Sequence, residues 1–275
     1  METYDDDLEL FEAGGALPLP VTGEEGYVEH DGARIWYASY GSGLPVILLH
    51  GGLGNAENWG YQRAALTAGG YRVVLIDSRG HGRSTRDARP FAYELMASDV
   101  RAVLDALHLA KAVLAGWSDG ATIALILAMN DPARVAGVFF FGCNMDPSGV
   151  KPVALPHPII DRIFRRHAKD YARLSATPDR FQAFVGAVSL MMQTQPNYSA
   201  ADLAQIRVPV TIAHSEHDEF IMREHAEYLA RTIPGAQLVM LPDVSHFAPL
   251  QRPQQFNRAV LRFLEGLTAD VTRGE

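Results

Sequence analysis

Short, continuously apolar runs alternate with longer amphipathic runs along most of this 275-residue chain. A short run that is apolar throughout is typical of a strand covered on both faces, as in a parallel sheet. A longer run with apolar positions three and four residues apart is typical of a helix with one face on a core. Together they predict an α/β fold with a mostly parallel, doubly wound sheet. The strand-like runs span residues 45–49, 71–77, 111–115, 135–141, 208–214 and 237–241.

Two further strands are predicted near the start of the chain. Residues 26–30 and 33–37 both alternate apolar and polar positions, and Asp31-Gly32 lies between them. An Asp-Gly pair between alternating runs is a strong signal for a β-hairpin. With the two strands of the hairpin, the expected sheet has eight strands.

The alternation stops between residues 146 and 206, after the sixth predicted strand. Two amphipathic stretches, residues 159–171 and 179–192, predict helices there. A helical insertion at this point predicts a cap (or lid) over the strand ends, which supplies an apolar wall for a substrate pocket. Arg162, Arg165 and Arg166 fall opposite the apolar stripe of the first helix and predict a solvated face.

The chain is therefore expected to consist of three parts. Residues 1–25, acidic and rich in Gly and Pro, predict a loosely attached arm. Residues 26–145 and 207–275 form the α/β core, and residues 146–206 form the cap.

Composition narrows the class of protein. About half of the residues are apolar, which is enough for a sizeable core, and the net charge of −8 argues against nucleic acid or an anionic membrane as partner. No run reaches the length of about 18 apolar residues that a membrane span needs. The acidic N-terminus does not look like a secretory signal, so cytoplasmic residence is expected. Because Cys143 is the single cysteine, an intramolecular disulfide is excluded, and no obvious base is present to activate its thiol. A monomer and a homodimer are both compatible with the sequence.

Gly116-Trp117-Ser118-Asp119-Gly120 is the main candidate for chemistry. An extended apolar run precedes it and a long run suited to a buried helix follows it. At a sharp turn from strand to helix, the two glycines avoid the clash that a Cβ would cause. The pattern predicts a nucleophile elbow with Ser118 at its exposed corner.

A serine hydroxyl needs a base, and the base needs an orienting acid. Working groups of open α/β sheets lie just past the carboxyl ends of the strands. That rule favours His246, after the last predicted strand, and Asp218, after the preceding one. The other acids near these strand ends, which remain alternatives to Asp218, are Glu216, Glu219, Asp243 and Asp146.

Acyl chemistry also needs N–H donors for a developing oxyanion. The backbone of Asp119, directly after the nucleophile, is one expected donor. The glycine-rich loop at residues 50–54 should give the other, from Gly52 or alternatively Leu53. His50 is expected to support this loop by hydrogen bonds.

These motifs together resemble those of the α/β-hydrolase fold superfamily, over about residues 26–267. The cap and the Gly-Trp-Ser-Asp-Gly elbow look most similar to cap-bearing serine hydrolases of the valacyclovir-hydrolase-like kind, and less closely to meta-cleavage-product C–C hydrolases. The resemblance implies acyl transfer to water through a serine ester, without a metal or organic cofactor. The residues that carry it are His50-Gly51-Gly52, Asp77 to Ser84, Ser118, Asp218 and His246.

The expected substrate is a small-molecule ester or lactone. Substrate contacts are expected from Asp119, Trp117, Met191 and Met192. An inward-pointing Asp119 carboxylate would favour cationic substrates such as α-amino acid esters, whereas the alternative is that it only caps the following helix. Lactone hydrolysis, C–C bond hydrolysis and a non-catalytic receptor or scaffold are the other functions that this sequence allows.

Overall fold

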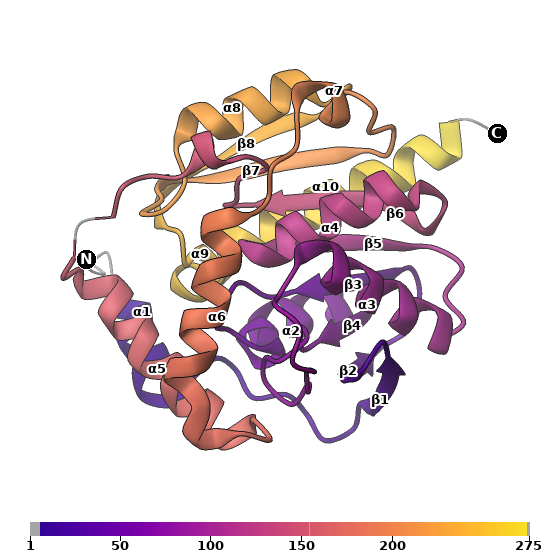
Figure 1. Ribbon diagram of the computed structural model, residues 1–275. Helices are drawn as coiled ribbons and strands as arrows, with labels where there is room; N and C mark the ends of the chain where they lie inside the picture. The colour runs from indigo at the N-terminus through magenta and orange to yellow at the C-terminus, as the bar shows by residue number, and fades with distance from the viewer. Residues whose placement is uncertain (1–5, 154, 274–275) are drawn as a thin grey trace.

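Eight strands form one sheet through the centre of the molecule (Figure 1). The computed structural model describes residues 6–153 and 155–273. The strands are β1 (Glu24–His30), β2 (Ala33–Tyr40), β3 (Pro45–Leu49), β4 (Arg72–Ile76), β5 (Ala112–Trp117), β6 (Val135–Phe141), β7 (Val210–His217) and β8 (Gln237–Ser245).

The strand order across the sheet is β1-β2-β4-β3-β5-β6-β7-β8. Strand β2 runs antiparallel to both of its neighbours, and all the other pairs are parallel. The β1–β2 hairpin turns at Asp31 and Gly32, which both have positive φ angles, as an Asp-Gly turn requires. The predicted mostly parallel, eight-stranded sheet is confirmed.

Helices cover both faces of this sheet. On one face, Ile47 and Leu49 of β3 belong to a hydrophobic cluster with residues of α3 (Tyr93–Ala106), α4 (Asp119–Asn130) and α8 (Arg223–Thr232). On the other face, Val46 and Leu48 belong to a cluster with residues of α2 (Gly60–Ala68) and α10 (Pro253–Arg273). Because successive strand residues point to opposite faces, a strand buried on both sides is apolar at every position. The short helix α9 (Ala248–Gln251) belongs to the same cluster as α2 and α10.

No helix in the described ranges is both long enough and apolar enough to cross a membrane.

Between β6 and β7 the chain leaves the sheet and forms α5 (Pro158–Leu174), α6 (Phe181–Thr194) and the short α7 (Ala200–Leu203). We call residues 146–206 the cap segment. Its aromatic side chains hold it together and onto the core. Tyr171 stacks on Phe184 with ring centroids 4.7 Å apart, and Phe184 meets His81 of the core edge-to-face at 4.7 Å.

The N-terminal part of the chain is more firmly packed than its composition suggests. Residues Asp6–Gly14 form helix α1, which packs against α5 (Figure 1), and its Leu8 and Phe11 side chains are fully buried. Glu12 of α1 forms ion pairs with Arg162 and Arg165 of α5, at 3.3 and 2.6 Å. The prediction of a loosely attached arm is wrong for residues 6–14, because two apolar residues and an acidic one match the face of α5. The first five residues of the predicted arm lie outside the described residues.

Candidate active site

Ser118 stands at a sharp corner between β5 and α4. Its backbone has φ 54° and ψ −127°, a conformation that costs energy for any residue with a side chain. The Ser118 N–H donates to the carbonyl of Phe141 on β6 at 2.8 Å, which fixes the corner to the sheet. A Cβ on Gly116 would lie 2.3 Å from the carbonyl oxygen of Gly120, and a Cβ on Gly120 would lie 2.1 Å from that of Leu49. The strand–turn–helix geometry expected for the pattern is therefore present.

His246 and Asp218 meet at the same edge of the sheet, each directly after a strand. The two strands run further than their apolar runs predict, β7 to His217 and β8 to Ser245. His246 Nδ1 lies 2.9 Å from Asp218 Oδ2. The other carboxylate oxygen of Asp218 accepts the backbone N–H groups of Phe220 and Ile221, both at 2.9 Å. The backbone of its own loop thus orients the Asp218 carboxylate, independently of the contact with the imidazole.

The nearby acids have other partners. Glu219 accepts the backbone N–H of His246 at 2.9 Å, and Glu216 accepts that of Asp243 at 3.0 Å. Asp146 accepts the backbone N–H of Ser148. Of the acids considered from the sequence, Asp218 is the one that the structure pairs with the His246 ring.

The electrostatics of the pair favour an ionised carboxylate beside a basic imidazole. Burial alone would raise the pKa of Asp218, but the charge and hydrogen bond of His246 outweigh burial and lower it. For His246 burial alone would lower the pKa, and the Asp218 carboxylate outweighs this effect and raises it. A histidine in this setting is a competent proton acceptor near neutral pH.

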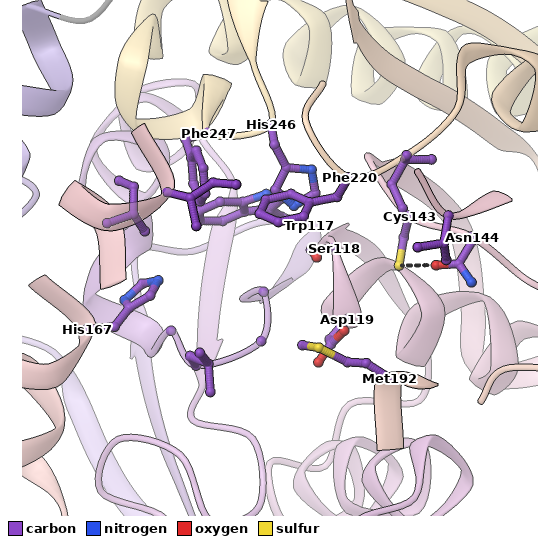
Figure 2. A pocket seen from close by; sticks show the side chains of 18 of the residues that line it. Trp117, Ser118, Asp119, Cys143, Asn144, His167, Met192, Phe220, His246 and Phe247 are labelled. Atoms are coloured by element: carbon purple, nitrogen blue, oxygen red, sulfur yellow. Dashed lines mark hydrogen bonds between the residues drawn. The ribbon is translucent and has the colours of Figure 1, made fainter. Parts of the chain in front are cut away.

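Ser118 and His246 open into one cavity of about 280 Å³ beneath the cap segment (Figure 2). A volume of this order suits a small to medium-sized ligand. The core contributes the elbow, Gly52, Leu53, Phe220 and Phe247. The cap segment contributes a mostly apolar wall, formed by Val150, Ile160, Ile163, Phe164, His167 and Met192.

The glycine-rich loop lies against the elbow. His50 supports it as expected, because its Nε2 accepts the Ser78 N–H at 3.0 Å and its Nδ1 meets the Gly51 carbonyl at 2.8 Å. A Cβ on Gly52 would lie 2.1 Å from the Met192 methyl carbon and 2.6 Å from Asp119 Oδ2. A larger residue at this position would therefore have to displace the Met192 and Asp119 side chains. Leu53 has a positive φ of 62°, so the loop is tightly bent here.

The Asp119 carboxylate faces the pocket. The Tyr93 hydroxyl donates to its Oδ1 at 2.7 Å, and its Oδ2 is buried with no hydrogen-bond partner in the described structure. Burial raises the pKa of Asp119 to about 6, against the opposing effects of the Tyr93 hydrogen bond and of His246. Of the two interpretations that the sequence left open, this arrangement favours the inward-pointing carboxylate over the helix cap.

The remaining predicted residues divide between pocket and core. Trp117 and Met192 line the pocket, whereas Met191 is buried in the hydrophobic core and is not among the residues that line the pocket. The prediction of Met191 as a substrate contact is corrected accordingly, because adjacent residues on a helix point in different directions. Cys143 also lines the pocket, but burial raises the pKa of its thiol to about 12, so it is a poor nucleophile.

Sequence reasoning missed Tyr93 and His167. Tyr93 lies 26 positions before Asp119 and no local pattern connects the two. His167 had a usable signal, since it falls four residues after Ile163 and four before Tyr171, on the buried stripe of α5.

The sheet order, the elbow and the histidine–carboxylate pair beyond β7 and β8 define a protein of the α/β-hydrolase fold. Residues 46–259 match the model of the Alpha/beta hydrolase family, and the chain belongs to this family.

Its relatives differ in activity. The human serine hydrolase BPHL is 27% identical over 267 residues, which cover 92% of this chain and 90% of that protein. A non-heme chloroperoxidase of Streptomyces lividans is 28% identical and covers 86% of this chain and 97% of its own length. A solved structure described as Est816, an N-acyl homoserine lactone degrading enzyme, superposes with a TM-score of 0.67 at 29% identity, covering 86% of this chain and 100% of that one. The similarities thus establish the family, and the relatives within it carry different activities.

Proposed function

We propose that this protein is a serine hydrolase that cleaves a carboxylic ester of a small to medium-sized molecule through an acyl-serine intermediate. The observation that carries the proposal is the Asp218–His246 pair, at 2.9 Å, opening into the same pocket as the strained Ser118 corner. A serine on a strained elbow with an oriented histidine is the arrangement that acyl transfer requires.

In the proposed mechanism His246 Nε2 takes the proton from Ser118 as the serine oxygen attacks the ester carbonyl. Asp218 holds the imidazole with its proton on Nδ1 and balances the positive charge that forms on the ring. His246 then gives the proton to the departing alcohol. Water, activated in turn by His246, releases the acid and regenerates the serine.

The oxyanion of each tetrahedral intermediate is assigned to the backbone N–H groups of Gly52 and Asp119. Each donor of this type is typically worth about 2.7–4 kcal/mol of transition-state stabilisation. The Gly52 loop lies close to the elbow, since a Cβ added to Gly52 would lie 2.6 Å from Asp119 Oδ2, and this proximity supports the assignment.

A fluorophosphonate probe is expected to label Ser118 and no other serine. Because the attack needs neutral His246, the labelling rate should fall as pH falls through the pKa of His246, which Asp218 holds above its usual value of about 6.5. The measurement is the labelling rate against pH, with the modified peptide identified by mass spectrometry.

The same experiment separates an enzyme from a receptor or scaffold with this fold. A non-catalytic binding protein has no need of an activated serine. Absence of labelling across the whole pH range, in protein shown to be folded, would therefore contradict the proposal.

We further propose that Asp119 selects esters whose acyl part carries a cationic group. The carboxylate is 6% exposed, has one unpartnered oxygen and lies in an otherwise mostly apolar pocket. A buried, incompletely paired charge is costly, and a cation on the substrate offsets that cost. An α-amino acid ester presents such a cation close to the reacting carbonyl.

Asp119→Asn is expected to lower kcat/KM for aminoacyl esters by about tenfold to a hundredfold, because a charge-assisted hydrogen bond to the substrate is lost. The kcat/KM for plain acyl esters, which do not form this bond, should change little. In the wild type the preference should rise with pH through about 6, where the carboxylate ionises. The ratio of the two kcat/KM values, measured against pH for both proteins, checks this. An identical ratio in the two proteins would assign the carboxylate a structural role only.

Lactone hydrolysis is a second candidate, since the same attack opens a cyclic ester. The similarity to the lactone-degrading Est816 favours including it, and a cavity of about 280 Å³ suits a small lactone. The kcat/KM values for a panel of esters and small lactones, assayed under the same conditions, show which of the two reactions the protein prefers.

A further inference from the structure

A second polar group enters the pocket from the cap segment, across the pocket from Ser118 and Asp119. Figure 2 shows the ring of His167 on one side of the pocket and Ser118, Asp119 and Met192 together on the other side. His167 is 5% exposed, and its Nδ1 is buried with no hydrogen-bond partner among the described residues.

The surroundings of His167 do not explain a polar residue here. Its ring meets Phe11 of α1 edge-to-face, with centroids 6.5 Å apart, and Gly54 packs close to its Cε1. Neither contact is a hydrogen bond. The neighbouring positions on the buried stripe of α5 are Ile163 and Tyr171, so an apolar residue would serve packing better than an unpartnered imidazole.

The nearest acid on α5 is engaged elsewhere. Asp170 is held by Arg166, at 2.9 Å from Nε, and by Arg173 at 3.1 Å. Burial, together with the smaller effects of His50 and Arg166, lowers the pKa of His167 to about 4, against the opposing effect of Asp170. The ring is therefore neutral at physiological pH. A neutral imidazole offers one donor and one acceptor.

We propose that His167 binds a hydroxyl group on the alcohol part of the substrate, so that the preferred substrates are esters of diols or polyols with one hydroxyl left free. This inference rests on the proposed function, in which Asp119 contacts the acyl part. Because His167 lies across the pocket from Asp119, the substrate group that reaches His167 is assigned to the leaving alcohol. A hydroxyl both donates and accepts, so it satisfies either tautomer of the ring.

The test compares matched pairs of esters that share one acyl group. In each pair the alcohol part is either a hydroxyalkyl chain or an alkyl chain with the same number of heavy atoms, and several chain lengths are used. The kcat/KM ratio within each pair is measured for the wild type and for His167→Phe, which keeps a ring against Phe11 and removes both nitrogens. His157→Phe is the matched control, because His157 precedes the same helix and is not among the residues that line the pocket.

At the best chain length we expect His167→Phe to lower the hydroxyalkyl-to-alkyl ratio about tenfold, the effect of one hydrogen bond lost in a buried site. His157→Phe should leave the ratio unchanged. His167→Gln, which retains a donor and an acceptor, should keep part of the preference. If the melting curve shows that His167→Phe is unfolded, the ratio measured for His167→Gln replaces that of the Phe variant in the test.

Two outcomes overturn the inference. If the wild type hydrolyses both kinds of ester and the ratio is the same in His167→Phe, His167 has no role in binding the alcohol, although the proposed function stands. A second set of pairs shares one alcohol and carries the hydroxyl in the acyl chain instead; if the preference that depends on His167 appears in this set, the assignment of the alcohol side is wrong. A wild type that cleaves no ester and resists the fluorophosphonate instead removes the proposed function itself.

Discussion

Ser118→Ala is expected to reduce kcat for a para-nitrophenyl ester by about four to six orders of magnitude. The substitution removes the only atom that becomes bonded to the acyl group in the proposed mechanism, whereas the oxyanion donors and the pocket remain. Residual rate enhancement from these remaining parts is the usual result when one member of a triad is lost.

The same variant should fold normally. The elbow is held by backbone groups: the Ser118 N–H donates to Phe141, and its carbonyl accepts the N–H groups of Ala121 and Thr122. Alanine keeps these bonds and has a Cβ like serine, so the strain at φ 54° is unchanged. Melting temperature should stay within a few degrees of the wild-type value. Ser42→Ala, at an exposed position, is the control for activity, and full turnover by Ser118→Ala would rule out the serine mechanism.

Gly120→Ala is expected to destabilise the fold by about 4 kcal/mol or more, at the upper end of what single substitutions do. The added Cβ would lie 2.1 Å from the carbonyl oxygen of Leu49, 2.4 Å from its carbonyl carbon and 2.7 Å from the carbonyl oxygen of His50. All three atoms belong to backbone at the end of β3, which is paired with β4 and β5. No side chain can move aside to relieve the overlap, so either the strand or the elbow must shift.

Gly266→Ala is the matched control for this prediction. Gly266 lies within α10, and a Cβ there has no neighbour within 4 Å. Alanine in the interior of a helix is favoured over glycine by about 0.5–1 kcal/mol, so this variant should be slightly more stable. Chemical denaturation of both variants measures the two free energies of unfolding. Wild-type stability in Gly120→Ala would show that the elbow does not approach β3 as closely as described.

Much of the fold could be predicted because its signals are local. A strand covered by helices on both faces must be apolar at each buried position, so β3, β4, β5 and β6 are visible as short runs in the sequence. The two glycines of the elbow are equally local, since each prevents a clash at a turn that the neighbouring residues define. The location of Asp218 and His246 at one edge of the sheet could also be predicted, because parallel strands bring their carboxyl ends to the same edge.

The sequence failed where partners come from distant segments. It allowed four acids besides Asp218 near the strand ends. The orientation of each carboxylate depends on its loop geometry, and Asp218 meets His246 across 28 positions of chain. Helix α1 is a similar case, because the burial of Leu8 and Phe11 requires the face of α5, which the N-terminal segment alone does not reveal.

The sequence by itself determined the sheet, the elbow and the order of Ser118, Asp218 and His246, because periodicity, glycine sterics and strand direction act over a few residues at a time. Only the tertiary structure decided where the polar side chains of the pocket point. It turned the Asp119 carboxylate toward Tyr93 and the cavity, and it placed His167 of the cap segment at the opposite end. Side-chain direction depends on contacts between elements far apart in the chain, and these contacts set the polarity of the pocket.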